Sequence, residues 1–270
     1  MSVIRIEDPE DPRIAPYRSV RERDLARADG CFIAEGDVVV RILLSGRSRF
    51  RAQSLLLADT AAGQAFGAEF GASLPTYAAS RAVMDRIVGF PIHRGILAVA
   101  GRGDPAEVDA ILPPGPARLL VLCGIANHDN VGGAFRNAAA FGADAVLLDG
   151  ESCDPLYRKA IRVSVGATLI VPFARRGSPE AILGRLTEAG FHILALSPEG
   201  REALDAVAWP KRVAIVVGSE GTGLSRAILS ARRTIRIGMA PGFDSLNVAT
   251  ASGIALHAAW SGSARPGAPD

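Results

Sequence analysis

Three blocks in the second half of the chain combine glycine and other small residues with a few polar side chains. They span residues 127–142 (NHDNVGGAFRNAAAFG), 216–225 (VVGSEGTGLS) and 235–251 (IRIGMAPGFDSLNVATA). Glycine lets backbone approach a neighbouring group closely, and a few polar groups in an apolar frame give a ligand its orientation. The three blocks together therefore predict a buried site for a polar ligand.

The first block contains a candidate anion-binding arginine. Asn130 stands just before a helix predicted at 131–141, where its side chain could cap the helix. Arg136 and Asn137 follow six and seven residues later, near two helical turns, and are expected on roughly the same face as Asn130. An arginine among small residues suits a ligand contact, but a surface salt bridge is an equally good interpretation of Arg136 alone.

The second and third blocks each add an acid or an amide. Glu220 follows the apolar run 213–217, at the carboxyl end of an apparent parallel strand, where α/β sheets bind ligands. Taken alone, Glu220 is better explained as a solvent-exposed loop residue. Ser245 can cap a final helix predicted from 246 to about 260. Capping by Ser245 leaves Asn247, with its amide donors and acceptor, unexplained.

The elements that must position these residues alternate regularly from residue 118 onward. Strands are predicted at 119–123, 145–148, 169–173, 191–196, 213–217 and 234–237, and helices at 131–141, 155–163, 179–189, 224–230 and from 246 to about 260. Apolar strands separated by helices indicate a parallel sheet that is covered on both faces.

A smaller α/β domain is predicted for residues 1–104. We expect helices at 19–27, 37–44 and 81–87, the last capped by Ser80, and strands at 54–58, 74–78 and 95–99. Residues 105–117 contain the run PPGP, which resists helix formation and indicates a linker. The second domain then covers 118–262, and 263–270 is expected to be a disordered tail.

Composition excludes several other classes of protein. The chain has 270 residues, a formal net charge of only +2, three widely spaced cysteines without a CxxC, and four histidines without metal-ligand spacing. We therefore expect no disulfide framework and no metal site. The N-terminus does not resemble a signal peptide, and no apolar run is long enough to span a membrane. A cytoplasmic protein is expected.

The common nucleotide-binding fingerprints are absent. Gly124 is followed by IANHDNVGG rather than by GxGxxG, and no GxxxxGK[ST] occurs. The GxxGxG spacing of Gly218, Gly221 and Gly223 matches neither pattern. A dinucleotide or P-loop enzyme is therefore not expected.

In their order and spacing, the three blocks resemble the signature motifs of the SpoU/TrmH branch of the SPOUT RNA methyltransferases. The resemblance runs from about residue 119 to 259, and the segment 157–166 (YRKAIRVSVG) is also similar to family sequence. More weakly, 32–36 and 93–96 resemble the family's N-terminal substrate-binding domain, which has the fold of a small ribosomal protein. The matching motif residues are Asn130, Gly132 and Arg136; Gly218, Glu220 and Gly221; and 245–248 (SLNV).

The resemblance implies a C-terminal parallel-sheet SPOUT domain with a deep trefoil knot, a homodimer formed through that domain, and S-adenosylmethionine as cofactor. Backbone at Gly218, Ile237 and Leu246 is then expected to hold the adenosine portion, with Met239 lining the pocket. The implied reaction is methyl transfer to a ribose 2′-hydroxyl of tRNA or ribosomal RNA.

The same resemblance assigns Arg136 as the catalytic arginine, with Asn130, Glu220, Ser245 and Asn247 positioning it and the ribose. A guanidinium stays protonated in proteins. We therefore expect Arg136 to bind an RNA phosphate and stabilise the developing alkoxide rather than to act as a base.

RNA binding also needs positive charge outside the motifs. The best candidate is the group Arg41, Arg47, Arg49 and Arg51, which has Phe50 among them, because charge beside an aromatic ring suits an unpaired base next to phosphates. A solvated loop explains this group equally well. Arg158, close to Lys159 and Arg162, is a second candidate near the expected active site.

Two departures from the family pattern keep alternatives open. His128-Asp129 stands where the family usually has Asp-Pro, and Gly238 replaces the usual proline after Ile237. The second change loosens backbone beside the expected cofactor pocket. A non-catalytic RNA-binding protein and an enzyme that methylates a base nitrogen therefore remain alternatives to ribose methylation.

Overall fold

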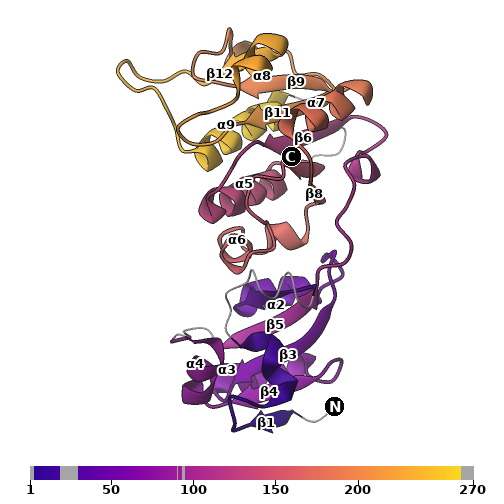
Figure 1. Ribbon diagram of the computed structural model, residues 1–270, viewed down its shortest axis with the longest axis vertical. Coiled ribbons are helices and arrows are strands. Elements are labelled where there is room, and N and C mark those ends of the chain that lie inside the picture. The colour runs from indigo at the N-terminus through magenta and orange to yellow at the C-terminus, as the bar shows by residue number, and fades with distance from the viewer. Residues whose placement is uncertain (1–2, 19–29, 90, 93–94, 263–270) are drawn as a thin grey trace. The chain divides into compact units, whose positions relative to one another are not determined.

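The structure is a computed structural model that describes residues 3–18, 30–89, 91–92 and 95–262. The predicted helix at 19–27, residues 93–94 of the N-terminal resemblance and the predicted tail at 263–270 lie outside the described residues. The chain forms two compact units, one of Met1–Asp104 with Leu156–Ile170 and one of Pro105–Pro155 with Val171–Asp270. Each unit is described by itself (Figure 1).

The first unit is built on a five-stranded mixed sheet in the order β1-β4-β3-β5-β2. β1, β4 and β3 pair in parallel, whereas β5 pairs antiparallel with both β3 and β2. The strands are β1 (Ile4–Ile6), β2 (Cys31–Glu35), β3 (Ala52–Ala58), β4 (Thr76–Ala79) and β5 (Ile96–Gly101), and the helices are α2 (Asp37–Leu44), α3 (Ala61–Phe70), α4 (Arg81–Val88) and α6 (Arg158–Val163).

Most predicted elements of this unit are confirmed. α4 starts after Ser80, whose side chain accepts a hydrogen bond from the backbone N–H of Val83, as predicted. β1, β2 and α3 were not predicted from the sequence. α3 lies close to the sheet because Gly63 faces the carbonyl oxygen of Ala58, which a Cβ would approach to 2.0 Å. Its glycine-rich sequence has little of the apolar periodicity that identifies a helix.

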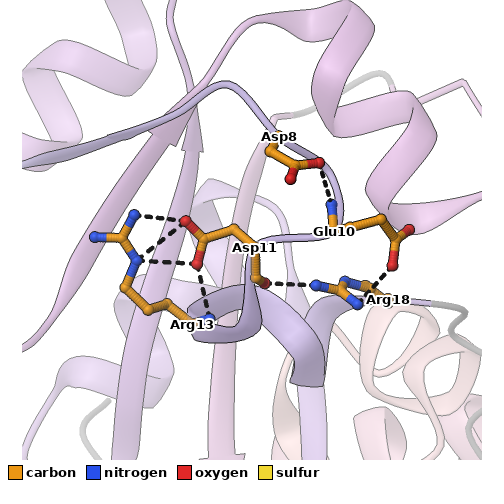
Figure 2. A network of polar contacts seen from close by, with 5 residues as sticks. All are labelled: Asp8, Glu10, Asp11, Arg13 and Arg18. Atoms are coloured by element: carbon orange, nitrogen blue, oxygen red, sulfur yellow. Dashed lines mark hydrogen bonds and ion pairs between the residues drawn. The ribbon is translucent and has the colours of Figure 1, made fainter.

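A short 3-10 helix, η1 (Pro12–Tyr17), was also missed, and a polar network surrounds its start (Figure 2). Asp11 caps η1 and binds Arg13, and these hydrogen bonds lower the pKa of the Asp11 carboxyl to about 2. The Asp11 carbonyl oxygen accepts from Arg18 at 2.6 Å. At the other end of η1, the fully buried Tyr17 places its hydroxyl 2.8 Å from the Oγ of Ser54. The network therefore fixes the start of η1, and the contact between Tyr17 and Ser54 joins its end to β3 of the sheet.

The second unit contains a seven-stranded sheet in the order β10-β12-β9-β11-β6-β7-β8, with parallel pairing throughout. This confirms the predicted α/β architecture. The strands are β6 (Ala117–Leu122), β7 (Ala145–Leu148), β8 (Phe173–Arg175), β9 (His192–Leu196), β10 (Glu202–Ala203), β11 (Arg212–Val217) and β12 (Arg233–Arg236), and the helices are α5 (His128–Ala140), α7 (Pro179–Glu188), α8 (Arg226–Ala231) and α9 (Val248–Gly262).

Helices cover this sheet. Ile182 of α7 and Ile228 of α8 share one buried cluster with Leu119 and Val121 of β6. α5 and α9 pack against each other, and in Figure 1 α9 (yellow) lies beside α5. The contact is close because Gly133 faces Ala249, where an added Cβ would come within 2.7 Å of the alanine Cβ. Gly133 of the first block therefore serves the packing of α5 against α9.

The prediction of a strand at 169–173 is wrong. Residues Ala167–Leu169 form a 3-10 helix, η3, and β8 begins only at Phe173. The apolar character of this segment reflects burial in a turn, since Leu169 is fully buried while its carbonyl oxygen accepts from the N–H of Arg49. A short apolar run cannot by itself distinguish a strand from another buried segment.

Residues 105–117, predicted as a linker, lie in the second unit and pack on it. Val108 is buried in the cluster that α7 and β6 share. Glu107 pairs with Arg176, Asp109 pairs with Arg185, and Arg212 donates to carbonyl oxygens of residues 113 and 115. The proline-rich segment is therefore anchored along most of its length.

None of the helices in the described ranges is long and apolar enough to cross a membrane. No group of three or more His, Cys, Asp or Glu side chains in these ranges has an arrangement that could hold a metal ion. Cys31, Cys123 and Cys153 are free thiols.

Candidate active site

The first motif begins one turn earlier than the sequence predicts. α5 starts at His128, and its cap is Asn127, whose side chain accepts from the N–H of Asp129 at 2.8 Å. The expectation that Asn130 caps the helix is therefore wrong. Asn130 is the third residue of α5 and is buried, at 4% exposure. Both asparagines are good caps by residue type, so only the start of the helix distinguishes them. As a result, the Asn130 side chain is free to make a tertiary contact.

That contact joins all three motifs. The Nδ2 of Asn130 donates to the Oε1 of Glu220 at 2.8 Å. The Nδ2 of Asn247 donates to the same Oε1 at 2.9 Å and to the Oδ1 of Asn130 at 2.8 Å. Residues that are 90 and 117 positions apart in the chain thus form one hydrogen-bonded triangle, which we call the amide–carboxylate cluster.

Asn247 also caps the last helix. α9 starts at Val248, and the Oδ1 of Asn247 accepts from the N–H groups of Ala249 and Thr250 at 2.9 and 3.2 Å. The prediction that Ser245 caps this helix is therefore wrong, because the helix begins two residues later than predicted. Ser245 instead donates to the carboxylate of Asp244 at 3.3 Å. The cap fixes the Asn247 oxygen and so directs its nitrogen at Glu220.

Glu220 lies on a tight loop whose conformation itself requires glycine at several positions. Ser219 and Gly223 form an isolated bridge, and Gly221 and Gly223 have φ values of 96° and 64°. A Cβ on Gly218 would come within 2.4 Å of the Gly223 backbone. Glycine is therefore required here by the loop's own closure, in addition to any approach of a ligand.

Arg136 does not join the cluster. It is exposed on α5, and none of its described contacts reaches the cluster. Six residues rotate a helix by roughly 600°, which places Arg136 about 120° away from Asn130, whereas seven residues bring Asn137 nearly back. Asn137 accordingly donates to the carbonyl oxygen of Ala249 at 2.6 Å. The expected shared face thus holds for Asn137 and fails for Arg136.

A cavity of about 1050 Å³ lies beside the cluster. It opens where β9, β11 and β12 end, which is the edge at which parallel α/β sheets bind ligands. All four residues predicted to bind the cofactor line it, as do three of the predicted catalytic residues. The four are Gly218, Ile237, Met239 and Leu246, and the three are Glu220, Ser245 and Asn247.

The cavity carries negative charge. Its charged lining residues are Glu199, Glu220 and Asp244, and among the described lining residues none is an arginine or lysine. Sequence reasoning missed Glu199, which follows β9 directly after Ser197 and Pro198, and it also missed Phe243, which is 76% exposed. The rule that parallel α/β sheets bind ligands at the carboxyl ends of their strands could have identified 197–199, because these residues follow β9.

The predicted RNA-binding arginines have different surroundings. Arg41 pairs with Asp37 and Glu69. Arg158 pairs with the buried Glu35 at 3.3 Å. Carboxylates of the same chain therefore already compensate the charge of both guanidinium groups. Arg41 and Arg158 are thus weaker candidates for binding an RNA phosphate than the sequence indicates.

The other three arginines lie between α2 and β3. Arg47, Arg49 and Arg51 are exposed, although partial burial lowers the pKa of Arg49. Phe50 packs edge-on against Phe32, with ring centroids 5.2 Å apart. Arg47 and Arg51 remain the members of the predicted patch that present their charge to solvent.

Comparisons with known proteins relate this arrangement to a family. The model of the SpoU rRNA methylase family matches residues 117–257. An uncharacterised tRNA/rRNA methyltransferase of Mycobacterium tuberculosis is 40% identical over 260 residues, covering 93% of this chain and 89% of that protein.

Solved structures share the fold. A crystal structure of an RNA 2′-O ribose methyltransferase has a TM-score of 0.79 at 26% identity, covering 96% of this chain and 99% of the other. A crystal structure of an AdoMet-bound rRNA methyltransferase from Sinorhizobium meliloti has a TM-score of 0.81 at 23% identity, covering 95% and 97%.

Proposed function

The chain belongs to the SpoU rRNA methylase family, and from that membership we propose that it transfers a methyl group from S-adenosylmethionine to a ribose 2′-hydroxyl of tRNA or ribosomal RNA. RNA methylation is the activity of the family, and S-adenosylmethionine is its methyl donor. The observation that supports the finer proposal is that Glu220 and Asn247 of the amide–carboxylate cluster line the cavity, while Asn130 of the first motif is hydrogen-bonded to both of them.

The cavity suits the donor in size and charge. Sites for small ligands typically have volumes of about 300–1000 Å³ and a mostly apolar lining with a few polar groups. Ile237, Met239 and Leu246 supply apolar surface for an adenosine, while Glu199 and Asp244 supply negative charge for a cationic ligand. In S-adenosylmethionine the methyl group is bonded to a positively charged sulfur. This sulfur is a good leaving group, because it becomes a neutral thioether when the methyl group is transferred.

The chain's own contribution is then alignment and charge. Holding two reactants in line is worth roughly 7–11 kcal/mol of the barrier. We assign Asn130 and Asn247 to holding Glu220 at the cavity, and Ser245 and Glu220 to orienting the ribose. Arg136, exposed on the same helix as Asn130, binds an RNA phosphate and stabilises the alkoxide that develops on the 2′-oxygen.

The remaining features of the family are proposals on the same basis. We propose that the C-terminal domain is knotted and forms a homodimer. We propose that residues 1–104 bind the RNA substrate and that Arg47, Arg49 and Arg51 contact its phosphates. We also propose that the protein acts in the cytoplasm.

Nucleoside mass spectrometry tests the proposal. RNA from a strain that lacks the gene is incubated with the protein and methyl-labelled S-adenosylmethionine, digested and analysed. Label in a 2′-O-methyl nucleoside, lost with Arg136→Ala, is expected. Label on a base would favour nitrogen methylation instead, and RNA binding without label would favour a non-catalytic protein. Arg136→Lys keeps the charge but loses the planar fork, so normal turnover by this variant would contradict a bidentate grip on phosphate.

A further inference from the structure

Two aspartates flank β7, and each accepts a hydrogen bond from a backbone N–H near one end of the neighbouring strand β6, Arg118 within the strand and Gly124 two residues after it. Before β7, the Oδ2 of Asp144 accepts from the N–H of Arg118 at 2.7 Å. After β7, the Oδ2 of Asp149 accepts from the N–H of Gly124 at 2.9 Å. The two bonds have the same chemistry but lie at opposite edges of the sheet. Only Asp149 lies at the edge that holds the cavity.

Asp149 is the centre of a buried polar network. It is 2% exposed, and its Oδ1 accepts from both the N–H and the Oγ of Ser152, at 2.8 and 2.6 Å. The Oγ of Ser152, itself fully buried, accepts from the N–H of Ile125 at 3.0 Å. The carboxylate therefore holds Gly124 directly and Ile125 through one hydroxyl.

The segment held in this way leads into the first motif. Gly124 has a φ of 67°, and a Cβ added to it would lie 3.7 Å from the Cβ of Ser219 in the loop that carries Glu220. Three residues further on, Asn127 caps α5, and Asn130 then meets Glu220. The position of Asn130 thus depends on a short connection whose backbone is bound to Asp149.

We propose that Asp149 is a positioning residue for methyl transfer, which holds the start of α5 so that Asn130 and Glu220 keep their register at the cavity. This inference rests on the proposed function of the same site. Asp149 itself does not line the cavity, so it acts through Gly124 and Ile125 rather than on a ligand.

Asp149→Asn tests the proposal, with Asp144→Asn as the matched control. An amide has the shape of a carboxylate but no charge and only one acceptor oxygen, so each variant weakens the backbone hydrogen bonding of its aspartate. We expect both variants to lower Tm. Asp149→Asn alone should lower kcat at saturating S-adenosylmethionine, roughly tenfold to a hundredfold, because small misplacements of reacting groups are costly. Calorimetry should show an S-adenosylmethionine Kd within about threefold of the wild-type value in both variants.

Equal kcat values for the two variants would overturn the proposal, as would a loss in Asp149→Asn that lies entirely in the affinity for S-adenosylmethionine. Should Asp149→Asn not fold, Ser152→Ala keeps the bonds that Asp149 accepts from the N–H groups of Gly124 and Ser152. It removes the hydroxyl that joins Asp149 to Ile125 and should lower kcat in the same direction by less.

A wild-type protein that transfers no methyl group would defeat the proposed function but not the positioning role. Amide hydrogen exchange over residues 124–130 tests the positioning role independently of methyl transfer. Exchange there should accelerate in Asp149→Asn and not in Asp144→Asn, and unchanged exchange would refute the role of Asp149.

Discussion

Replacing Asn247 by aspartate separates the two functions of this side chain, which are capping α9 and donating hydrogen bonds within the amide–carboxylate cluster. The new carboxylate keeps an oxygen for the N–H groups of Ala249 and Thr250, and a negative charge at a helix N-terminus is favourable by roughly 0.3–1 kcal/mol. It loses the nitrogen that donates to Glu220 at 2.9 Å and to Asn130 at 2.8 Å. Asn247→Asp should therefore leave α9 capped while opening the amide–carboxylate cluster.

The size of the effect follows from the distances. A hydrogen bond to a charged acceptor contributes about 1.5–3 kcal/mol. Two carboxylates about 3 Å apart at an exposed, water-like site repel by a further ~1 kcal/mol or more. After the gain at the helix is subtracted, about 2–3 kcal/mol remains. Since about 1.4 kcal/mol corresponds to a factor of ten, kcat/KM should fall roughly 30-fold to 150-fold at pH 8.

The assay is methyl transfer between pH 8 and pH 5, with Tm measured in parallel. At acid pH two neighbouring carboxylates share a proton, so the repulsion becomes a hydrogen bond and part of the activity of Asn247→Asp should return relative to wild type. Asn247→Ser is the control, because it can still cap α9 but introduces no charge, and it should show no such recovery. Wild-type kcat/KM for Asn247→Asp at pH 8 would refute the role given to the cluster.

Three further predictions concern other parts of the second unit. Arg118→Met should lower the free energy of unfolding in urea by about 2–4 kcal/mol, because the buried guanidinium binds the carbonyl oxygen of Phe141 and the last turn of α9; no loss would contradict that role. Burial raises the pKa of the Cys153 thiol to about 11, so iodoacetamide should modify it roughly a hundredfold more slowly at pH 8 than an unfolded thiol, and its contribution to stability, full below about pH 9, should be lost as pH rises towards 11. Because Glu199 and Asp244 line a cavity without lysine or arginine among its described residues, calorimetry should show tighter binding of cationic S-adenosylmethionine than of its uncharged-sulfur product. This preference should shrink with salt and in Glu199→Gln, and a preference unaffected by either would exclude long-range charge as its cause.

Much of the second unit was predictable because each buried parallel strand is a short apolar run between helices. β7 and β11 illustrate this, since their residues are buried along almost the whole strand. The same logic failed at 169–173, where apolar residues are buried in a turn. It also missed α3, whose glycines pack against β3 instead of forming an apolar stripe.

The candidate site was predictable in its residues but not in its geometry. The motif spacing selected Asn130, Glu220 and Asn247, yet which asparagine caps which helix depends on where α5 and α9 begin, and residue type alone does not fix that. Arg136 could have been placed off the shared face by counting helical rotation. The role of Asp149 lies in contacts between strand ends that no local pattern records.

We propose that the cavity at the ends of β9, β11 and β12 holds the methyl donor beside the amide–carboxylate cluster. A crystal structure of the chain with S-adenosylmethionine tests this most directly. We expect the ligand between Gly218, Ile237 and Leu246, with its methyl group directed towards Glu220. A ligand bound elsewhere, or bound here with its methyl group turned away from the cluster, would contradict this proposal.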